Sequence, residues 1–117
     1  MTINGKVGSF GYEGERAHTS DHPPVFKGGP VKADNGSYPA GLVLAVDGNG
    51  DLVPCEDLAT ETIAGINDAP VDTTQEDVAV YVAHGTVKRD MLAKGAAAAA
   101  LTAADLAKLE ALGVYAV

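Results

Sequence analysis

Residues 42–53 read LVLAVDGNGDLV, and this stretch decides the fold class. A run of apolar residues that includes β-branched valines is interrupted by Asp, Gly and Asn, and two apolar residues then resume the pattern. The Asn-Gly pair within it supplies the positive backbone dihedral angles that tight hairpin turns need. The stretch therefore predicts a β-hairpin with strands at residues 42–46 and 52–53.

The same stretch also matches the start of a calcium-binding loop. Asp47, Asn49 and Asp51 occupy the first three ligand positions, where alternating oxygens face one ion. The sixth position of the loop needs glycine and is Leu52, and the twelfth needs glutamate and is Leu58. We therefore interpret the stretch as a turn between two strands and predict no metal site.

Apolar segments on the carboxyl side of the hairpin continue the β pattern. Residues 62–66 and 78–83 predict two strands, and the bulky side chains at 78, 80 and 82 share one face of the second. A turn is expected at residues 84–85, followed by a short strand at 86–88. Before the hairpin, residues 38–41 (YPAG) predict another turn.

The spacing of apolar residues changes near the carboxyl terminus from the alternation of strands to a helical repeat, and residues 101–113 predict a helix. Thr102 suits the N-cap, and Asp105 lies near the positive end of the helix. Gly113 can adopt the left-handed conformation that ends a helix. Residues 114–117 then predict an edge strand.

Leucines predict how this helix packs. Leu106 and Leu109 share a stripe that Leu112 extends, so we expect one narrow face of the helix to lie on the sheet. The alanine run at residues 96–100 leaves two interpretations open, a helical lead-in or a close-packed contact of small residues.

The first thirty residues have little apolar periodicity and contain glycine at 5, 8, 11, 14, 28 and 29. We expect residues 1–30 to form an extended N-terminal arm. Residues 31–117 are expected to form a single β-rich domain. The predicted fold is α+β and mostly β, a compact small β-barrel or sandwich-like domain with one C-terminal helix.

Composition restricts the partners and the compartment. The chain has 117 residues, enough for one domain, and a formal net charge of −8. Residues 1–30 carry equal numbers of basic and acidic side chains, so the negative excess lies in residues 31–117. An acidic body repels phosphates, which excludes nucleic acid and membranes as favoured partners. Cys55 is the only cysteine, which excludes an internal disulfide and suits synthesis in a reducing cytoplasm.

The arm contains histidines and an acidic residue that are candidate metal ligands. His18, Asp21 and His22 have side chains that can converge on an ion when they lie on a helix. Residues 23–24 are both proline, which disfavours a helix there. We interpret the segment as a polar, solvated arm.

The remaining titratable residues give little support to catalysis. Glu56, Asp57 and Glu61 cluster in a polar connector, where carboxylates are normally solvated, and His84 precedes a glycine without an obvious partner. No nucleophile elbow, phosphate-binding glycine loop or zinc-protease helix is present. The sequence therefore predicts a protein that is not an enzyme and has no cofactor.

The order of these segments resembles the lambda-type bacteriophage head decoration family, from Ala17 to Val117. Every motif is short, and the resemblance lies in their succession along the chain. The segments that carry it are Ala17-His18-Thr19, Pro39-Ala40-Gly41, Leu52-Val53, Ile63-Ala64-Gly65-Ile66, Val71-Asp72-Thr73-Thr74, Gly85-Thr86-Val87, Asp90-Met91-Leu92 and Gly113-Val114-Tyr115-Ala116-Val117.

The resemblance implies a homotrimer that binds the major capsid protein on the outer surface of an expanded phage head and stabilises the head against internal pressure. The arm would become ordered against the capsid, adding to an exposed sheet edge through main-chain hydrogen bonds. The arm residues expected to contact the capsid are Val7, Phe10, Tyr12, Arg16 and His18. The alternative for Val7, Phe10 and Tyr12 is that they pack back on their own domain.

Two other classes of function are alternatives to a decoration protein. A β-rich phage fibre or host-surface attachment module would share the composition and would bind a glycan or receptor. A small hydrolase would need a pocket that joins His18 or His84 to the carboxylates.

Overall fold

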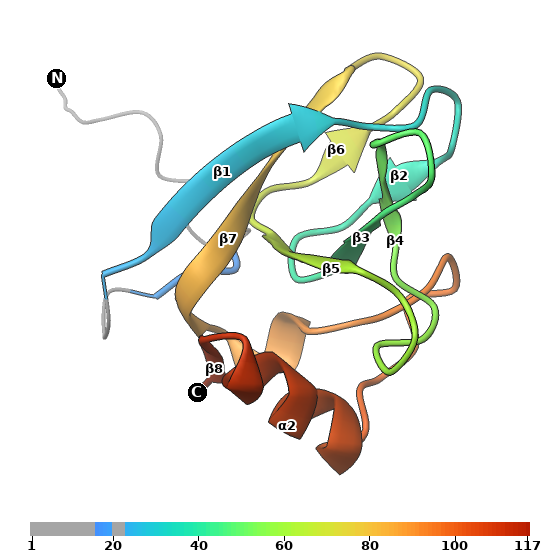
Figure 1. The fold of residues 1–117 in the computed structure, drawn as a ribbon. Coiled ribbons are helices and arrows are strands. Elements are labelled where there is room, and N and C mark those ends of the chain that lie inside the picture. Colours follow the sequence, from blue (N-terminus) through green and yellow to red (C-terminus); the bar gives the residue numbers. More distant parts are fainter. Residues whose placement is uncertain (1–15, 20–22) are drawn as a thin grey trace, which may run out of the picture.

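The computed structural model describes residues 16–19 and 23–117 (Figure 1). Strands dominate, and one α-helix lies near the carboxyl terminus, so the prediction of a mostly β fold with one C-terminal helix is confirmed. The elements in chain order are β1 (Val25–Pro30), β2 (Ser37–Tyr38), β3 (Val43–Val46), β4 (Leu52–Pro54), β5 (Ile63–Asn67), β6 (Val71–Asp72), β7 (Val78–Val87), the 3-10 helix η1 (Arg89–Met91), α2 (Ala103–Ala111) and β8 (Val114–Ala116).

One main sheet organises the domain, with strands in the order β1-β7-β5-β3-β4 and β8 paired to β7. The five strands of that path are antiparallel to their neighbours, whereas β8 runs parallel to β7. β2 and β6 form a separate two-stranded sheet. The main sheet is not closed into a barrel. Its two ends meet at a single bridge, where Val31 lies beside Leu52.

The predicted hairpin is confirmed as β3 and β4, with Val46 opposite Leu52. The side chain of Asp47 stabilises the turn, since its Oδ1 accepts hydrogen bonds from the backbone N–H groups of Asn49 and Asp51, both at 2.9 Å. Aspartate commonly closes turns in this way. The alternating polar residues thus have a structural role in the chain reversal.

Strand β7 is longer than predicted. The turn expected at His84 and Gly85 is wrong, because β7 continues through both residues to Val87. Residues 78–84 of β7 pair with β1, and residues 85–87 pair with β8. The distant strand β8 supplies ladder partners that local sequence does not reveal, and tertiary pairing overrides the turn propensity of glycine.

The C-terminal helix begins as predicted. Thr102 and Asp105 form a reciprocal capping box, in which each side chain accepts a hydrogen bond from the other residue's backbone N–H. Gly113 follows the helix with φ 92°, the left-handed conformation expected at its end. Val114–Ala116 then forms β8, which confirms the predicted terminal strand.

Packing of this helix differs from the prediction in one residue. Leu109 is buried in the core, and Leu106 packs partly buried against it. Leu112 is 46% exposed, so its assignment to the buried stripe is wrong. The helix ends at Ala111, and the chain turns before Leu112 can follow the stripe.

The residues of the alanine run at 96–100 are all exposed, and most of them lie in a turn closed by a bridge between Lys94 and Ala99. It is neither a helical lead-in nor a close-packed contact within this chain.

The Pro-Ala-Gly turn joins three parts of the domain at Gly41. The Gly41 N–H donates to the Asn67 carbonyl at 2.8 Å, and the Gly41 carbonyl accepts from the Ala93 N–H at 3.1 Å. Gly41 has φ 93°, and a Cβ atom there would lie 2.0 Å from the Met91 carbonyl oxygen. Only glycine fits this position without displacing backbone.

We predict that Gly41→Ala lowers the free energy of unfolding by roughly 2–4 kcal/mol, since it combines backbone strain with a clash. Gly36 has φ 82° but has open space around its Cβ position, so Gly36→Ala should lower the free energy of unfolding by only about 1 kcal/mol. Denaturant unfolding of both variants measures the difference. Equal losses would show that the approach to Met91 does not matter.

Candidate functional site

Residues 16–19, the arm root, are held between two parts of the domain. On one side the Ala17 N–H donates to the Asp68 carbonyl at 3.0 Å, and on the other the Ala17 carbonyl accepts from the Lys88 N–H at 2.8 Å. The Thr19 N–H donates to the Thr86 carbonyl at 3.0 Å. Ala17 is fully buried in the main core cluster. The arm root is thus an extended segment docked in the body.

Asp68 is the centre of this region. Its side chain is 1% exposed, and the Oδ1 atom accepts from the His18 backbone N–H at 3.1 Å and lies 2.8 Å from His18 Nδ1. The Oδ2 atom forms an ion pair and a hydrogen bond with the Arg16 guanidinium. The His18 ring also meets the Phe26 ring edge-on, with centroids 5.1 Å apart. Two side chains from the arm root therefore satisfy one buried carboxylate.

Burial and hydrogen bonding act in opposite directions on Asp68. Burial alone would raise the pKa of the Asp68 carboxyl, because it disfavours the charged form. Hydrogen bonds from His18 and Arg16 outweigh burial and hold the pKa of Asp68 below its ordinary value. Asp68 is therefore ionised at neutral pH, and its charge stabilises the docked arm root.

The ladder of β1 and β7 presents an uncharged face to solvent beyond the arm root. Gly28 lies opposite Val80 and Pro30 opposite Val78, and residues opposite one another in a sheet share a face. Val78 is 53% exposed, Val80 49% and Phe26 41%. We call this surface the charge-free stripe; it consists of Phe26, Gly28, Pro30, Val78 and Val80.

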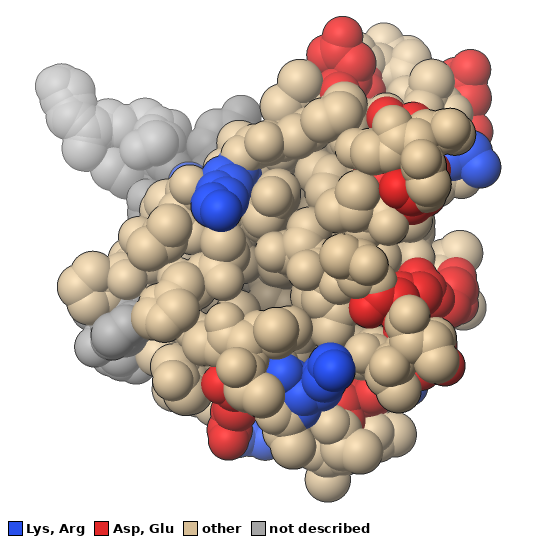
Figure 2. All heavy atoms as spheres, viewed as in Figure 1, with Lys and Arg blue, Asp and Glu red and all other residues tan. Residues whose placement is uncertain are grey.

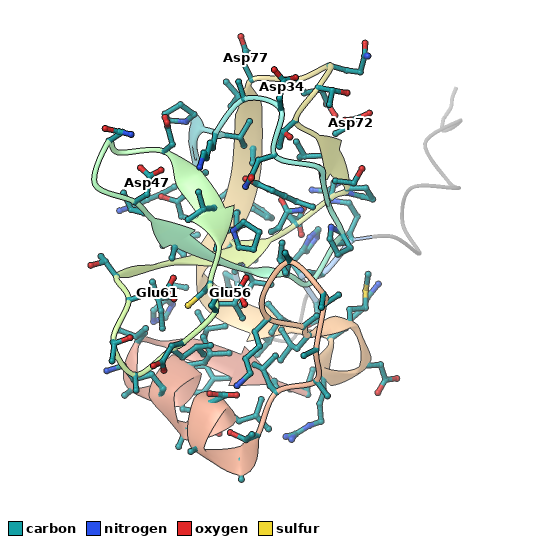
Figure 3. All side chains as sticks on the ribbon, turned by 90° about the vertical axis from the view of Figure 1, so that its right-hand side faces the viewer. Asp34, Asp47, Glu56, Glu61, Asp72 and Asp77 are labelled. Atoms are coloured by element: carbon teal, nitrogen blue, oxygen red, sulfur yellow. The ribbon has the colours of Figure 1, made fainter. Side chains whose placement is uncertain are left out.

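Acidic side chains gather on another side of the domain. Figure 2 shows them along the right of the view, and Figure 3 looks directly at that side. Several of them close local turns, as Asp72 does by accepting from the backbone N–H and the hydroxyl of Thr74. The labelled residues of this acidic flank are Asp34, Asp47, Glu56, Glu61, Asp72 and Asp77.

The carboxylates considered for acid and base chemistry have structural partners. Glu61 Oε2 accepts from the backbone N–H groups of Glu56 and Asp57 at 3.2 and 3.0 Å. Glu56 Oε2 accepts from the Ala96 N–H at 2.9 Å. They close the connector after β4, in agreement with a surface role.

The histidines and the cysteine have structural neighbours of their own. The ring of His84 packs edge-on to Tyr115, with centroids 6.4 Å apart, and the ring of His18 contacts the Asp68 carboxylate. Burial raises the pKa of the Cys55 thiol to about 11, which leaves it protonated and poorly nucleophilic. In residues 16–19 and 23–117 no group of three or more His, Cys, Asp or Glu side chains could hold a metal ion.

Sequence reasoning placed Arg16 and His18 on the arm as capsid contacts, and the structure brings both to Asp68. Val7, Phe10 and Tyr12 lie outside the described residues, as do Asp21 and His22 of the weighed metal cluster. Asp68 was not identified, because the segment Asn67-Asp68-Ala69-Pro70 has the composition of a turn. The only sequence signal was an acidic residue directly after a buried strand.

Comparison with known protein families gives a match over most of the chain. The family model described as bacteriophage lambda head decoration protein D matches residues 12–114, which includes the arm root and nearly all of the domain. No curated protein matches the chain. Among the helices of the described residues, none has the length and apolar character needed to span a membrane.

We predict a pH dependence of stability that is specific to Asp68. Because its pKa is lower in the folded state than in the unfolded state, its stabilising effect is present above the ordinary value of 3.8 and is lost as the pH falls through the folded value. Asp68→Asn should therefore lower the free energy of unfolding by on the order of 1–3 kcal/mol at pH 7, and by progressively less below about pH 4.

Denaturant unfolding of the wild type and the variant at a series of pH values measures this convergence. A difference that stays constant down to pH 2 would contradict the role of the ionised carboxylate.

Proposed function

Because the chain belongs to the bacteriophage lambda head decoration protein D family, we propose that it binds as a homotrimer to the outer surface of an expanded phage head and stabilises the head against internal pressure. Its partner there is the major capsid protein. The protein is made in the host cytoplasm and acts as a structural component without catalysis. The family match over residues 12–114 carries this proposal and favours it over a fibre or attachment module.

The arm is proposed to make the contact with the capsid. Residues 1–15 precede a root that is fixed to the body, and Val7, Phe10 and Tyr12 supply apolar side chains for a partner surface. In this proposal Arg16 and His18 contribute by holding the root, since both bind Asp68. Val25–Pro30, the last six residues of the predicted 1–30 arm, pair with β7 and belong to the sheet.

The charge-free stripe is the surface proposed for contact between subunits. The chain carries a net charge of −8, so copies that meet through acidic surfaces repel one another. The stripe exposes Val78 and Val80 without a charged side chain on the same face of the ladder. A second copy of this chain can therefore cover it without bringing like charges together.

We predict that removal of residues 1–15 leaves a folded, self-associating body that no longer stabilises heads. The three arms of one trimer act together, so their loss should weaken binding by about 100-fold or more. The measurement is the temperature at which expanded, undecorated heads are disrupted, with either protein added. Full protection by the truncated protein would exclude the arm as the capsid contact.

A second prediction concerns self-association. Val80→Asp places a charge in the proposed subunit contact and should raise the concentration for half-assembly by about tenfold or more. Val46→Asp is the matched control, because Val46 is 37% exposed on β3, away from the stripe. Light scattering over a concentration series measures the assembly of both variants. If Val80→Asp assembles as the wild type does, the subunit contact lies elsewhere. That result would favour coverage of the charge-free stripe by the arm of the same chain.

A further inference from the structure

The arm leaves the body from a fixed point. His18 bridges to Val87 at the end of β7, and Ala17 hydrogen-bonds on one side to Asp68 and on the other to Lys88. The arm root is therefore fixed along both of its edges. The position and direction of the main chain at residues 16–19 are fixed by these contacts.

Asp68 is itself rigidly placed. It follows directly on β5, and its N–H donates to the Val80 carbonyl of β7 at 3.1 Å. Its side chain is 1% exposed, so the carboxylate has no room to follow a moving arm. The arm root is thus held in place relative to β5 and β7.

The carboxylate fixes main chain as well as side chains. Oδ1 accepts from the backbone N–H of His18 in addition to facing its ring, and Oδ2 pairs with Arg16. These two residues flank the buried Ala17. Loss of the charge would leave both without their partner, and loss of either would leave a buried charge less well compensated. We call Asp68 with Arg16 and His18 the Asp68 clamp.

We infer that Asp68 is a positioning residue for capsid binding: it fixes the point and direction from which residues 1–15 reach the shell, although its own side chain is buried in the body. This inference rests on the proposed function, because it concerns how the arm is presented to that partner. It assigns a binding role to a residue that touches no partner.

The affinity of the arm for the capsid depends on the fraction of molecules in which the arm root is docked. If only a fraction of molecules has the root docked, the apparent affinity of the arm falls by that fraction. Three arms on one trimer must be placed together to bind together, which makes the effect larger for the assembly than for one arm. The Asp68 clamp can therefore change the affinity of the trimer for the capsid without contacting the capsid.

The test compares Asp68→Asn with Asp77→Asn in the full-length protein. Both remove one negative charge, but Asp77 is exposed, and its backbone carbonyl, which the substitution keeps, accepts from the Val31 N–H. Hydrogen exchange of the isolated protein reports protection of the Ala17 and Thr19 N–H groups, and co-sedimentation with expanded, undecorated heads reports binding. We expect Asp68→Asn to lose protection at the root and, with the root docked in about a tenth of molecules, to bind heads at least about tenfold more weakly, since each of the three arms loses about that factor.

Arg16→Gln provides a second variant that weakens the clamp from the arm, at a side chain that is 35% exposed and poses little risk to folding. It should lose root protection and head affinity together, as Asp68→Asn does. Asp77→Asn should match the wild type in both measurements.

Three results are decisive against parts of this account. Normal root protection in Asp68→Asn would overturn the clamp. Lost protection with unchanged head binding would overturn the positioning role. Failure of the wild-type protein itself to bind heads would overturn the proposed function, while the exchange result on the isolated protein would still decide whether the clamp exists.

Discussion

A buried carboxylate that must be compensated is the constraint on which the organisation of this protein depends. Asp68 lies at the end of β5 with its side chain 1% exposed, and an ionised group in that position requires partners. The partners come from residues 16 and 18, far away in sequence. The electrostatic requirement of one residue therefore attaches residues 16–19 to the sheet and holds Ala17 in the core.

The domain has three distinct surfaces, and each suits a different environment. The arm root lies against the end of β7, the charge-free stripe continues along β1 and β7, and acidic side chains occupy the flank seen in Figure 3. The proposed function assigns one surface to the shell, one to contact between copies of the chain and one to solvent. Neither large aromatic anchors nor a deep pocket are required when several modest contacts act together.

Local chemistry made much of the fold predictable. The hairpin of β3 and β4, strand β5 and the capped helix α2 each depend on residues adjacent in sequence, such as Asp47 at the turn and Thr102 at the cap. The errors arose where distant segments decide: β8 carries β7 through Gly85, and β7 recruits Val25–Pro30 as a strand. The site was only half predictable, since Arg16 and His18 were identified but Asp68, 52 residues from Arg16, was not.

Electron cryo-microscopy of expanded, undecorated heads mixed with the protein tests the central claim most directly. The account predicts added density with threefold symmetry at the local threefold positions of the shell, with the arm root of each copy on the side that faces the capsid. Bare heads, or density for single copies attached through the acidic flank, would contradict it.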